Sequence, residues 1–487
     1  MKNNAAIVER QVAKNPKKRL RLILLGIVVL AGICIAILNR VEGSRRDTLV
    51  AELKGKKILM EIPELLNTGQ GSAARPAASW KNSAQNFLYS PEAGGDPQAP
   101  NNARVADWPW YQVSQTSLRV FFLKPGEDKE ICAVVAEHRP FLEKLRKVSL
   151  MDQASPEAMV EHTMSGRSIW TARLPNLLAA RSFANLLVLD AYVCLKNGQA
   201  DMALSDIGAI LRLGQLIRNP TFLVSHLIGN AVHNIGLQGL AQIVPGTTFS
   251  ESTLAELEKD LAKPNPRENL TRSYQFETLS IKLIYDALNG RGATPVGDLP
   301  GLLGGKSYYY YLYALPVFSF WRARDEIRGL GLFAEAVALS REPWYRGREE
   351  RTRLESEIRA LDWKTPVLHL AMPNWVGGIR SALQTETLLR QARIAVALNR
   401  FQRASGAYPE ALSALVPQFI QEVPTDPFTG REMPYTKGAK GFLLYSWGEN
   451  GEAEALKSTA GQSDDKVVTV QDFQVGPGDD IVWGKIF

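Results

Sequence analysis

Apolar residues recur at helical intervals through the middle of this chain. One stripe, spaced three or four positions apart, runs from Phe183 to Cys194, and a second runs from Ala203 to Ile217. The pair Asn197-Gly198 separates them, and such a pair is typical of the turn between two helices. The pattern therefore predicts a helical hairpin. The stripes consist of Phe183, Leu187, Ala191 and Cys194, then Ala203, Ile207, Ile210, Gly214 and Ile217.

The helical spacing continues on both sides of this hairpin. A helix predicted over 221–244 has Gly229 and Gly236 one heptad apart, which lets a neighbouring helix approach closely. Ser250 has the side chain that favours the N-cap of the helix that follows it. We therefore predict an α-helical domain, built from helical hairpins, over residues 108–377.

An apolar run lies near the N-terminus. Leu22–Leu38 contains no charged residue, and its length is at the short end of what spans a bilayer. Residues 1–21 hold seven basic side chains and one acidic side chain, so the positive-inside rule keeps this tail in the cytoplasm. We predict a single transmembrane helix over 22–38. The bulk of the chain would then be periplasmic or otherwise extracytoplasmic.

A cleaved signal peptide is the rival interpretation of the same apolar run. The residues after Leu38 read NRVEGSRRD and contain no small-x-small cleavage site. An uncleaved anchor therefore fits the sequence better.

The segments around the helical domain have their own patterns. Apolar positions at helical intervals predict a stalk helix over 40–66. Residues 67–107 are rich in Gly, Ala, Ser, Asn and Pro and show no apolar period, so we predict a linker or a loosely packed excursion there. Beyond Arg403, short β runs separated by Gly and Pro replace the helical spacing. The sequence thus predicts a mainly α fold that ends in a small α+β module over 378–487.

Charge and cysteine content narrow the function. The 487 residues carry a formal net charge of +7, and most of it lies in the tail 1–21. The remainder is near neutral and has no electrostatic footprint for nucleic acid. One of the three cysteines, Cys34, lies in the predicted span. An oxidising compartment would allow Cys132 and Cys194 to form a bridge, whereas their apolar helical surroundings favour buried free thiols.

A series of short motifs follows the last long helix. They are Gly406-Ala407-Tyr408-Pro409, Leu412 with Leu415, Val423–Pro427, Pro434-Tyr435, Tyr445–Gly448 and Asp480–Trp483. In type and order they resemble the C-terminal half of the major pseudopilin of type II secretion systems. The whole layout also resembles uncharacterised bacterial single-pass membrane proteins that carry such a module behind a helical domain.

The resemblance implies a long helix packed on a small antiparallel sheet, a bacterial inner membrane as the place of the anchor, and partners in a secretion-like assembly. The anchor differs from that of the family. It has no acidic residue and no processing site, and a long helical region separates it from the module. Assembly as a pseudopilus subunit is therefore not expected.

Many pseudopilins bind calcium in the final loop, so the resemblance also points to Glu449, Asn450, Asp479 and Asp480 as calcium ligands. Calcium prefers six to eight oxygen ligands, several of them from carboxylates, and Asn450 offers only a neutral amide oxygen. In the alternative interpretation, Asp479 and Asp480 cap turns. The sequence leaves both open and implies no other cofactor.

Other candidate chemistry is weak. The run Gly301–Ser307 resembles a phosphate loop, but Pro300 occupies the position of its first glycine. His226, Asn230 and His233 share one helix face, and a metal site there would need a third ligand. A hydrogen-bonded polar stripe inside the core is the simpler interpretation.

These observations favour a binding or structural protein of the cell envelope that is anchored once in the membrane and has other envelope proteins as partners. The alternative is an envelope hydrolase whose site lies in a helical cleft near His226, His233 or Tyr308–Tyr313. No catalytic motif decides between them, and no catalytic residue is predicted.

Overall fold

The fold is known from a computed structural model. It describes residues 16–58, 80–90 without 89, 117–154 without 124–125, 176–218, 222–291, 315–372 without 316, 318 and 363–364, 375–451 without 439–440, and 482–485. The chain forms two compact units. Unit 1 comprises Met1–Met60, Thr278–Glu335 and Ser356–Pro373, and unit 2 comprises Glu61–Glu277, Ala336–Glu355 and Asn374–Phe487. The described part is mostly helical, and this confirms the predicted fold class at that level.

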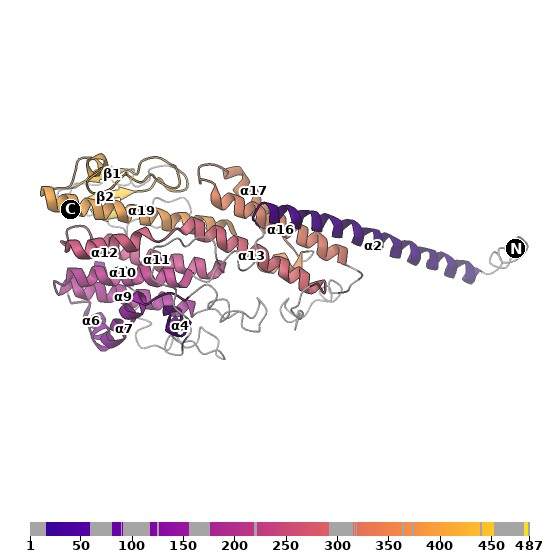
Figure 1. The fold of residues 1–487 in the computed structure, drawn as a ribbon, viewed down its shortest axis with the longest axis horizontal. Coiled ribbons are helices and arrows are strands. Elements are labelled where there is room, and N and C mark those ends of the chain that lie inside the picture. The colour runs from indigo at the N-terminus through magenta and orange to yellow at the C-terminus, as the bar shows by residue number, and fades with distance from the viewer. Residues whose placement is uncertain are drawn as a thin grey trace, which may run out of the picture. The chain divides into compact units, whose positions relative to one another are not determined.

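Unit 1 contains the long helix α2, Pro16–Gly55, which includes the predicted transmembrane span (Figure 1). The structure joins this span to most of the predicted stalk in one uninterrupted helix. The side chains from Leu24 to Leu30 are all exposed. From Asn39 onward, α2 contacts α16, Ser319–Arg341, within the same unit. The N-terminal half of α2 therefore presents an apolar surface, and its C-terminal half is packed.

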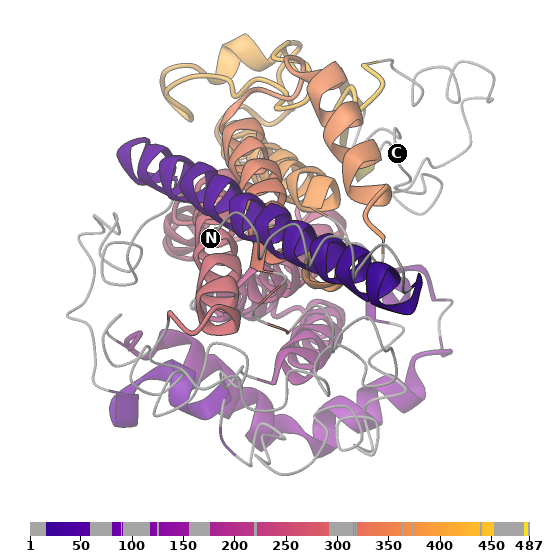
Figure 2. The same cartoon turned by 90° about the vertical axis from the view of Figure 1, so that its right-hand side faces the viewer.

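The core of unit 2 is a layer of antiparallel helices that follow one another in the chain. They are α9 (Leu177–Lys196), α10 (Ala200–Arg218) and α11 (Leu223–Ile243), with α12 (Glu251–Ala262) and α19 (Trp375–Ser405) packed alongside (Figure 1). Figure 2 looks roughly along these helices. α9 is apolar and long enough to cross a membrane, but 78% of its apolar window is buried, as expected for a core helix.

The predicted hairpin of α9 and α10 is confirmed. Asn176 caps the start of α9, since its side chain accepts a hydrogen bond from the Ala179 N–H at 3.0 Å. Gly198 has φ of +72°, which only glycine adopts without strain, and it ends the turn after α9. Both predicted stripes are buried. Ser250 caps α12 as expected, since its hydroxyl accepts from the Thr253 N–H.

Glycines let α10 and α11 approach each other. A Cβ on Gly214 would lie 2.2 Å from Nδ1 of His233, and a Cβ on Gly229 would lie 2.5 Å from Cγ of Arg218. Real Cβ atoms do not come this close to other atoms. The predicted close contact at Gly229 is therefore confirmed, and the space left by each glycine is filled by a polar side chain of the other helix.

The C-terminal part of unit 2 continues from α19 into a short helical turn and a three-stranded sheet. Its strands are antiparallel in the order β1 (Tyr435–Lys437), β2 (Phe442–Tyr445) and β3 (Val482–Lys485). Every residue of β2 is buried. Residues 467–470, which form one of the short apolar runs expected as strands beyond Arg403, lie outside the described residues, as do Tyr308–Tyr313.

Part of the interval predicted as a linker is packed. Within 67–107, the structure describes a short helix, α4 (Ala84–Leu88), whose Phe87 ring lies 6.0 Å from that of Phe183. Cys132 and Cys194 are free thiols. The remaining described elements are η1 (Trp80–Asn82), η3 (Ser117–Phe122), α6 (Lys129–Glu137), α7 (Arg139–Leu150), α13 (Pro266–Leu288), α17 (Arg348–Arg359), α18 (Pro366–Ala371) and η6 (Leu412–Leu415).

Candidate functional site

The histidines singled out in the sequence lie in a buried polar cluster between α10 and α11. His226, Asn230 and His233 project from α11, and Arg218 comes from the last turn of α10. All four are at least nine-tenths buried. We call them the histidine–arginine cluster. The sequence identified its three α11 members but not Arg218. The available signal was that Arg218 is a basic residue directly after the apolar stripe that ends at Ile217.

Hydrogen bonds fix the tautomers in this cluster. Arg218 Nη2 donates to Oδ1 of Asn230 at 2.8 Å, and Asn230 Nδ2 donates to Nε2 of His226 at 3.0 Å. The proton of His226 is therefore on Nδ1. His233 donates from Nδ1 to the Gly229 carbonyl at 2.9 Å, which leaves its Nε2 as an acceptor.

The charge in this cluster resides on Arg218. Burial, together with the positive charge of Arg218, holds the pKa of both imidazoles well below the usual histidine value. Burial lowers the pKa of Arg218 to about 9, so at neutral pH it remains a cation. Among the residues that the structure describes, its Nε and Nη1 have no hydrogen-bond partner, and neither do His226 Nδ1 and His233 Nε2. The cluster thus combines neutral imidazoles with a buried cation that lacks a carboxylate partner among the described residues.

A second buried cluster was not predicted from the sequence. Arg146 of α7 donates from Nε to Oδ1 of Asp206 on α10 at 2.6 Å, and from Nη2 to Asp190 on α9. Cys194 lies one helical turn beyond Asp190, with its sulfur 3.8 Å from Oδ1 of that residue. Two acids inside otherwise apolar helix faces were the available sequence signal. This acid–arginine cluster joins three helices.

The acid–arginine cluster holds more acid than base. Burial raises the pKa of Asp206 to about 7, and it raises the pKa of Asp190 too, although Arg146 opposes both shifts. Burial also raises the pKa of Cys194 to about 12, so its thiol stays protonated and unreactive. Ligand atoms of Asp190, Cys194 and Asp206 lie within 4.8 Å of one another. The guanidinium of Arg146 already occupies the place where a metal ion would neutralise these carboxylates.

Asp426 organises the loops of the C-terminal module. Its Oδ1 accepts from the backbone N–H groups of Phe428 at 2.7 Å and Thr429 at 3.2 Å. Its Oδ2 accepts from the N–H of Trp447 at 2.8 Å. One buried carboxylate therefore joins the turn at 423–427 to the turn at 445–448, which are two of the motifs quoted above. This structural role accounts for the aspartate of the first motif.

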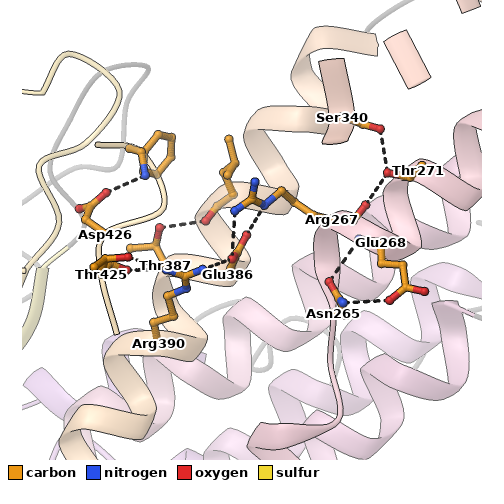
Figure 3. A network of polar contacts seen from close by, with 12 residues as sticks. Asn265, Arg267, Glu268, Thr271, Ser340, Glu386, Thr387, Arg390, Thr425 and Asp426 are labelled. Atoms are coloured by element: carbon orange, nitrogen blue, oxygen red, sulfur yellow. Dashed lines mark hydrogen bonds and ion pairs between the residues drawn. The ribbon is translucent and has the colours of Figure 1, made fainter. Parts of the chain in front are cut away.

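A polar network fixes the loop at Thr425 to α19 and α13 (Figure 3). Glu386 of α19 accepts from Arg267 Nε at 2.7 Å and from Arg390 Nη2 at 2.6 Å. Arg390 also donates from Nη1 to the Thr425 carbonyl at 2.7 Å. The acidic side chain is shared by two arginines, and the three segments are held in register.

The predicted calcium ligands are only partly described. Both carboxylate oxygens of Glu449 accept from Arg380, at 2.9 and 3.1 Å. Asn450 lies beside it in the same turn, whereas Asp479 and Asp480 lie outside the described residues. The guanidinium of Arg380 competes with any cation for Glu449. The calcium site remains a prediction.

A shallow groove lies between α12, α19 and the segment after η6. Its volume is about 560 Å³, and it is lined by Glu251, Arg400, Arg403, Ala404, Gln418 and Phe419. Arg400 pairs with Glu251 at 2.7 Å and with Glu258 at 2.9 Å, and Arg403 donates to the Phe249 carbonyl at 2.6 Å. These arginines connect α19 to α12.

A polar stripe on α2 fixes this helix to the rest of unit 1. Glu42 accepts from Arg324 at 2.8 Å, and Arg46 donates from Nε to Glu326 at 2.9 Å and from Nη2 to Asp286. Glu42 and Arg46 are buried. Because the stripe begins at Asn39, directly after the apolar run, we call Asn39, Glu42 and Arg46 the anchor junction. Their spacing of three and four positions was visible in the sequence but was not interpreted.

Comparison with protein-family models, with curated proteins and with solved structures gave no match for this chain.

Proposed function

We propose that this chain is a single-pass protein of the bacterial inner membrane that binds other proteins of the cell envelope. The observation that carries the proposal is the division of α2 into two halves. Its N-terminal half exposes apolar side chains, of which Val28 is 66% and Leu30 is 63% accessible. Its C-terminal half is fixed to the helices of unit 1 by the anchor junction. An apolar helix that continues into a packed domain is suited to anchoring that domain.

The sequence supports the orientation. Basic residues are denser before Leu22 than after Leu38, so by the positive-inside rule the N-terminus lies in the cytoplasm and the chain beyond the apolar run lies on the other side. A signal sequence is also apolar and N-terminal. The helix runs without a break from its exposed apolar half into the half that packs on unit 1, and this continuity favours retention of the helix over its removal.

The C-terminal module supports a place in a secretion-like assembly. A long helix, α19, precedes a small antiparallel sheet, in keeping with the resemblance to the major pseudopilin. In this proposal the module is a docking surface, and Glu449, Asn450, Asp479 and Asp480 bind calcium once Arg380 releases Glu449. The partners are other envelope proteins.

One observation favours the alternative of an envelope hydrolase. In the histidine–arginine cluster, the neutral His233 has a free Nε2 that suits a proton acceptor, and Arg218, which has no carboxylate partner among the described residues, suits a developing negative charge. Against this, the cluster is buried, and its hydrogen bonds run between its own members, to the Gly229 carbonyl and to the Ser381 hydroxyl of α19. Binding is therefore the function that we put forward first.

Fractionation of bacterial cells tests the anchor and its orientation. We expect the full chain to stay with the membrane after alkaline extraction, and protease added outside the inner membrane to digest it beyond residue 58. A chain without residues 1–38 should appear in the soluble fraction. A shortened wild-type chain in the soluble fraction would identify α2 as a signal sequence, and protection of the bulk of the chain would reverse the orientation.

Purification from membranes in mild detergent tests the binding role. We expect a defined envelope protein to co-elute in constant proportion with the full chain. Loss of that protein when Arg380→Glu is introduced, with retention when the exposed Glu410→Lys is introduced, would place the contact on the C-terminal module. If the chain elutes alone from native membranes at every detergent concentration, the binding role is wrong.

A further inference from the structure

A second exposed apolar surface lies beside α2 in unit 1. Leu315 and Val317, in the segment that leads into α16, are 45% and 46% accessible. Among the described residues of unit 1, the other large apolar side chains with this degree of exposure all belong to α2. A short apolar segment that remains open next to an apolar helix calls for an explanation.

The position of this segment along α2 is fixed by Asn39. The Asn39 side chain donates from Nδ2 to the Val317 carbonyl at 3.3 Å and accepts the Phe320 N–H at 2.6 Å. Asn39 follows directly after Leu38, where the apolar run of α2 ends. Leu315 and Val317 therefore lie at the level where α2 would leave a bilayer. On α2 itself, the nearby Ile37 and Val41 are also exposed.

Charged groups at this level match a phospholipid surface. Arg45 and Arg324 both pair with the single carboxylate of Glu42, at 3.7 and 2.8 Å. At Glu42, two cations therefore face one anion, and the side chains of Arg45 and Arg324 are 71% and 55% exposed. Arg324 also lies over the Phe320 ring. Aromatic and basic residues next to an apolar surface are typical of membrane interfaces.

We propose that Leu315 and Val317 insert into the headgroup region of the bilayer that α2 crosses, with Arg45 and Arg324 facing lipid phosphates. This inference rests on the proposed membrane anchor. It adds a second contact with the bilayer, made by the start of α16, and it names lipid as the occupant of this surface. The continuity with the exposed half of α2 and the exposed guanidinium groups of Arg45 and Arg324 both favour lipid over a protein partner.

Photo-crosslinking of the full chain tests this contact. The chain is reconstituted in vesicles of phosphatidylethanolamine and phosphatidylglycerol, with p-benzoylphenylalanine in place of Val317, Leu30 or Val224 in separate variants. Val224 lies on α11 of unit 2 and has a similar exposure, 44%, so it is the matched control. After illumination, lipid adducts are measured by intact mass. We expect strong adducts at Leu30 and Val317, and several times less at Val224.

The other outcomes separate the two proposals. Adducts at Leu30 with only the Val224 level at Val317 would overturn the interfacial contact and leave the anchor intact. Absence of adducts at Leu30 would overturn the anchor, and with it the inference. The same variants are also illuminated in native membranes. A protein adduct at Val317 without a lipid adduct there would show that this surface binds a protein, and the inference would be wrong.

Discussion

Asp206 is the residue at which burial and charge conflict most clearly. Its carboxyl shares Arg146 with Asp190, close to Arg139 and Cys194, and its pKa rises to about 7 from an ordinary value of 3.8. The folded chain thus holds a proton that the unfolded chain loses near pH 4. The stability that this proton contributes is complete below about pH 4 and is lost as the pH rises through 7.

We therefore predict that Asp206→Asn removes this pH dependence, because the carboxamide stays neutral and still accepts from Arg146. The free energy of unfolding of the wild type should fall relative to that of the variant by up to about 4 kcal/mol between pH 4 and pH 8, from the size of the pKa shift. Urea unfolding at a series of pH values measures it. Parallel profiles for the two proteins would show that Asp206 is ionised throughout.

Asp426 carries a different prediction, because its three partners are backbone N–H groups. Asp426→Ala leaves the N–H groups of Phe428, Thr429 and Trp447 without their acceptor. We expect a loss of about 3 kcal/mol in the free energy of unfolding, since hydrogen bonds to charged groups are worth about 1.5–3 kcal/mol each and water replaces part of them.

Chemical denaturation of the same protein measures this loss. The control is Glu410→Ala, which removes an exposed ion pair with Lys437 and should change stability by less than about 1 kcal/mol. Equal effects of the two substitutions would show that the turn at 423–427 is not held by Asp426.

Sequence reasoning reached only part of these sites. The shared face of His226, Asn230 and His233 followed from helical spacing, and the structure brings them together. Arg218, Arg146 and Asp206 were not found, because their partners lie on other helices. The spacing of residues within one helix does not show which side chains of other helices they contact. Asp479 and Asp480 lie outside the described residues, so their role stays a prediction.

At the scale of helices, the contact between α10 and α11 depends on residues without side chains. We predict that Gly214→Ala destabilises the chain by about 1–3 kcal/mol, the usual cost of an overpacked core, since its methyl group would overlap the His233 ring. Gly331→Ala on α16 is the control, because a Cβ there meets nothing within 4 Å. Alanine is the better helix former, so the control should gain about 0.4–1 kcal/mol.

Thermal unfolding of the two glycine variants compares these effects. The melting temperature should fall for Gly214→Ala and stay constant or rise for Gly331→Ala. An equal fall in the melting temperature of both variants would mean that the close approach of α10 and α11 does not restrict the side-chain size at position 214.

Helices whose apolar residues recur at regular intervals were predictable from the sequence. The segments that connect the elements were less predictable. Helical spacing located α9, α10, α11 and α12, because burial of one face repeats along each of them. The span and the stalk were predicted as separate helices and form one, since the change from apolar to polar composition at Asn39 does not interrupt the backbone. The predicted linker lacked a period, yet α4 packs through Phe87 and Leu88 within it.

For the whole molecule, α19 decides whether the C-terminal module is separable. The sequence suggests that the module beginning at Gly378 folds alone. In the structure, Ile394–Asn399 is buried without interruption, and α19 packs on α11 and α12. A helix that is buried all round belongs to a larger core. We therefore expect a fragment of residues 378–487 to lack a cooperative transition that the full chain shows.

Circular dichroism of this fragment and of the full chain during heating measures the difference. A fragment that extends from residue 176 to the C-terminus restores α11 and α12 and should regain cooperative unfolding. Cooperative unfolding of the short fragment alone would show that the module is independent of the helical bundle.

The continuity of α2 has a mechanical consequence. A helix of 40 residues is about 60 Å long, and no break divides its exposed half from its packed half. The hydrogen bonds of Asn39, Glu42 and Arg46 prevent the rotation between α2 and the other helices of unit 1 that a flexible linker would allow. If α2 crosses a bilayer as proposed, a change in membrane thickness that alters its tilt turns unit 1 through the same angle. The orientation of unit 1 would then depend on the thickness of the membrane that α2 crosses.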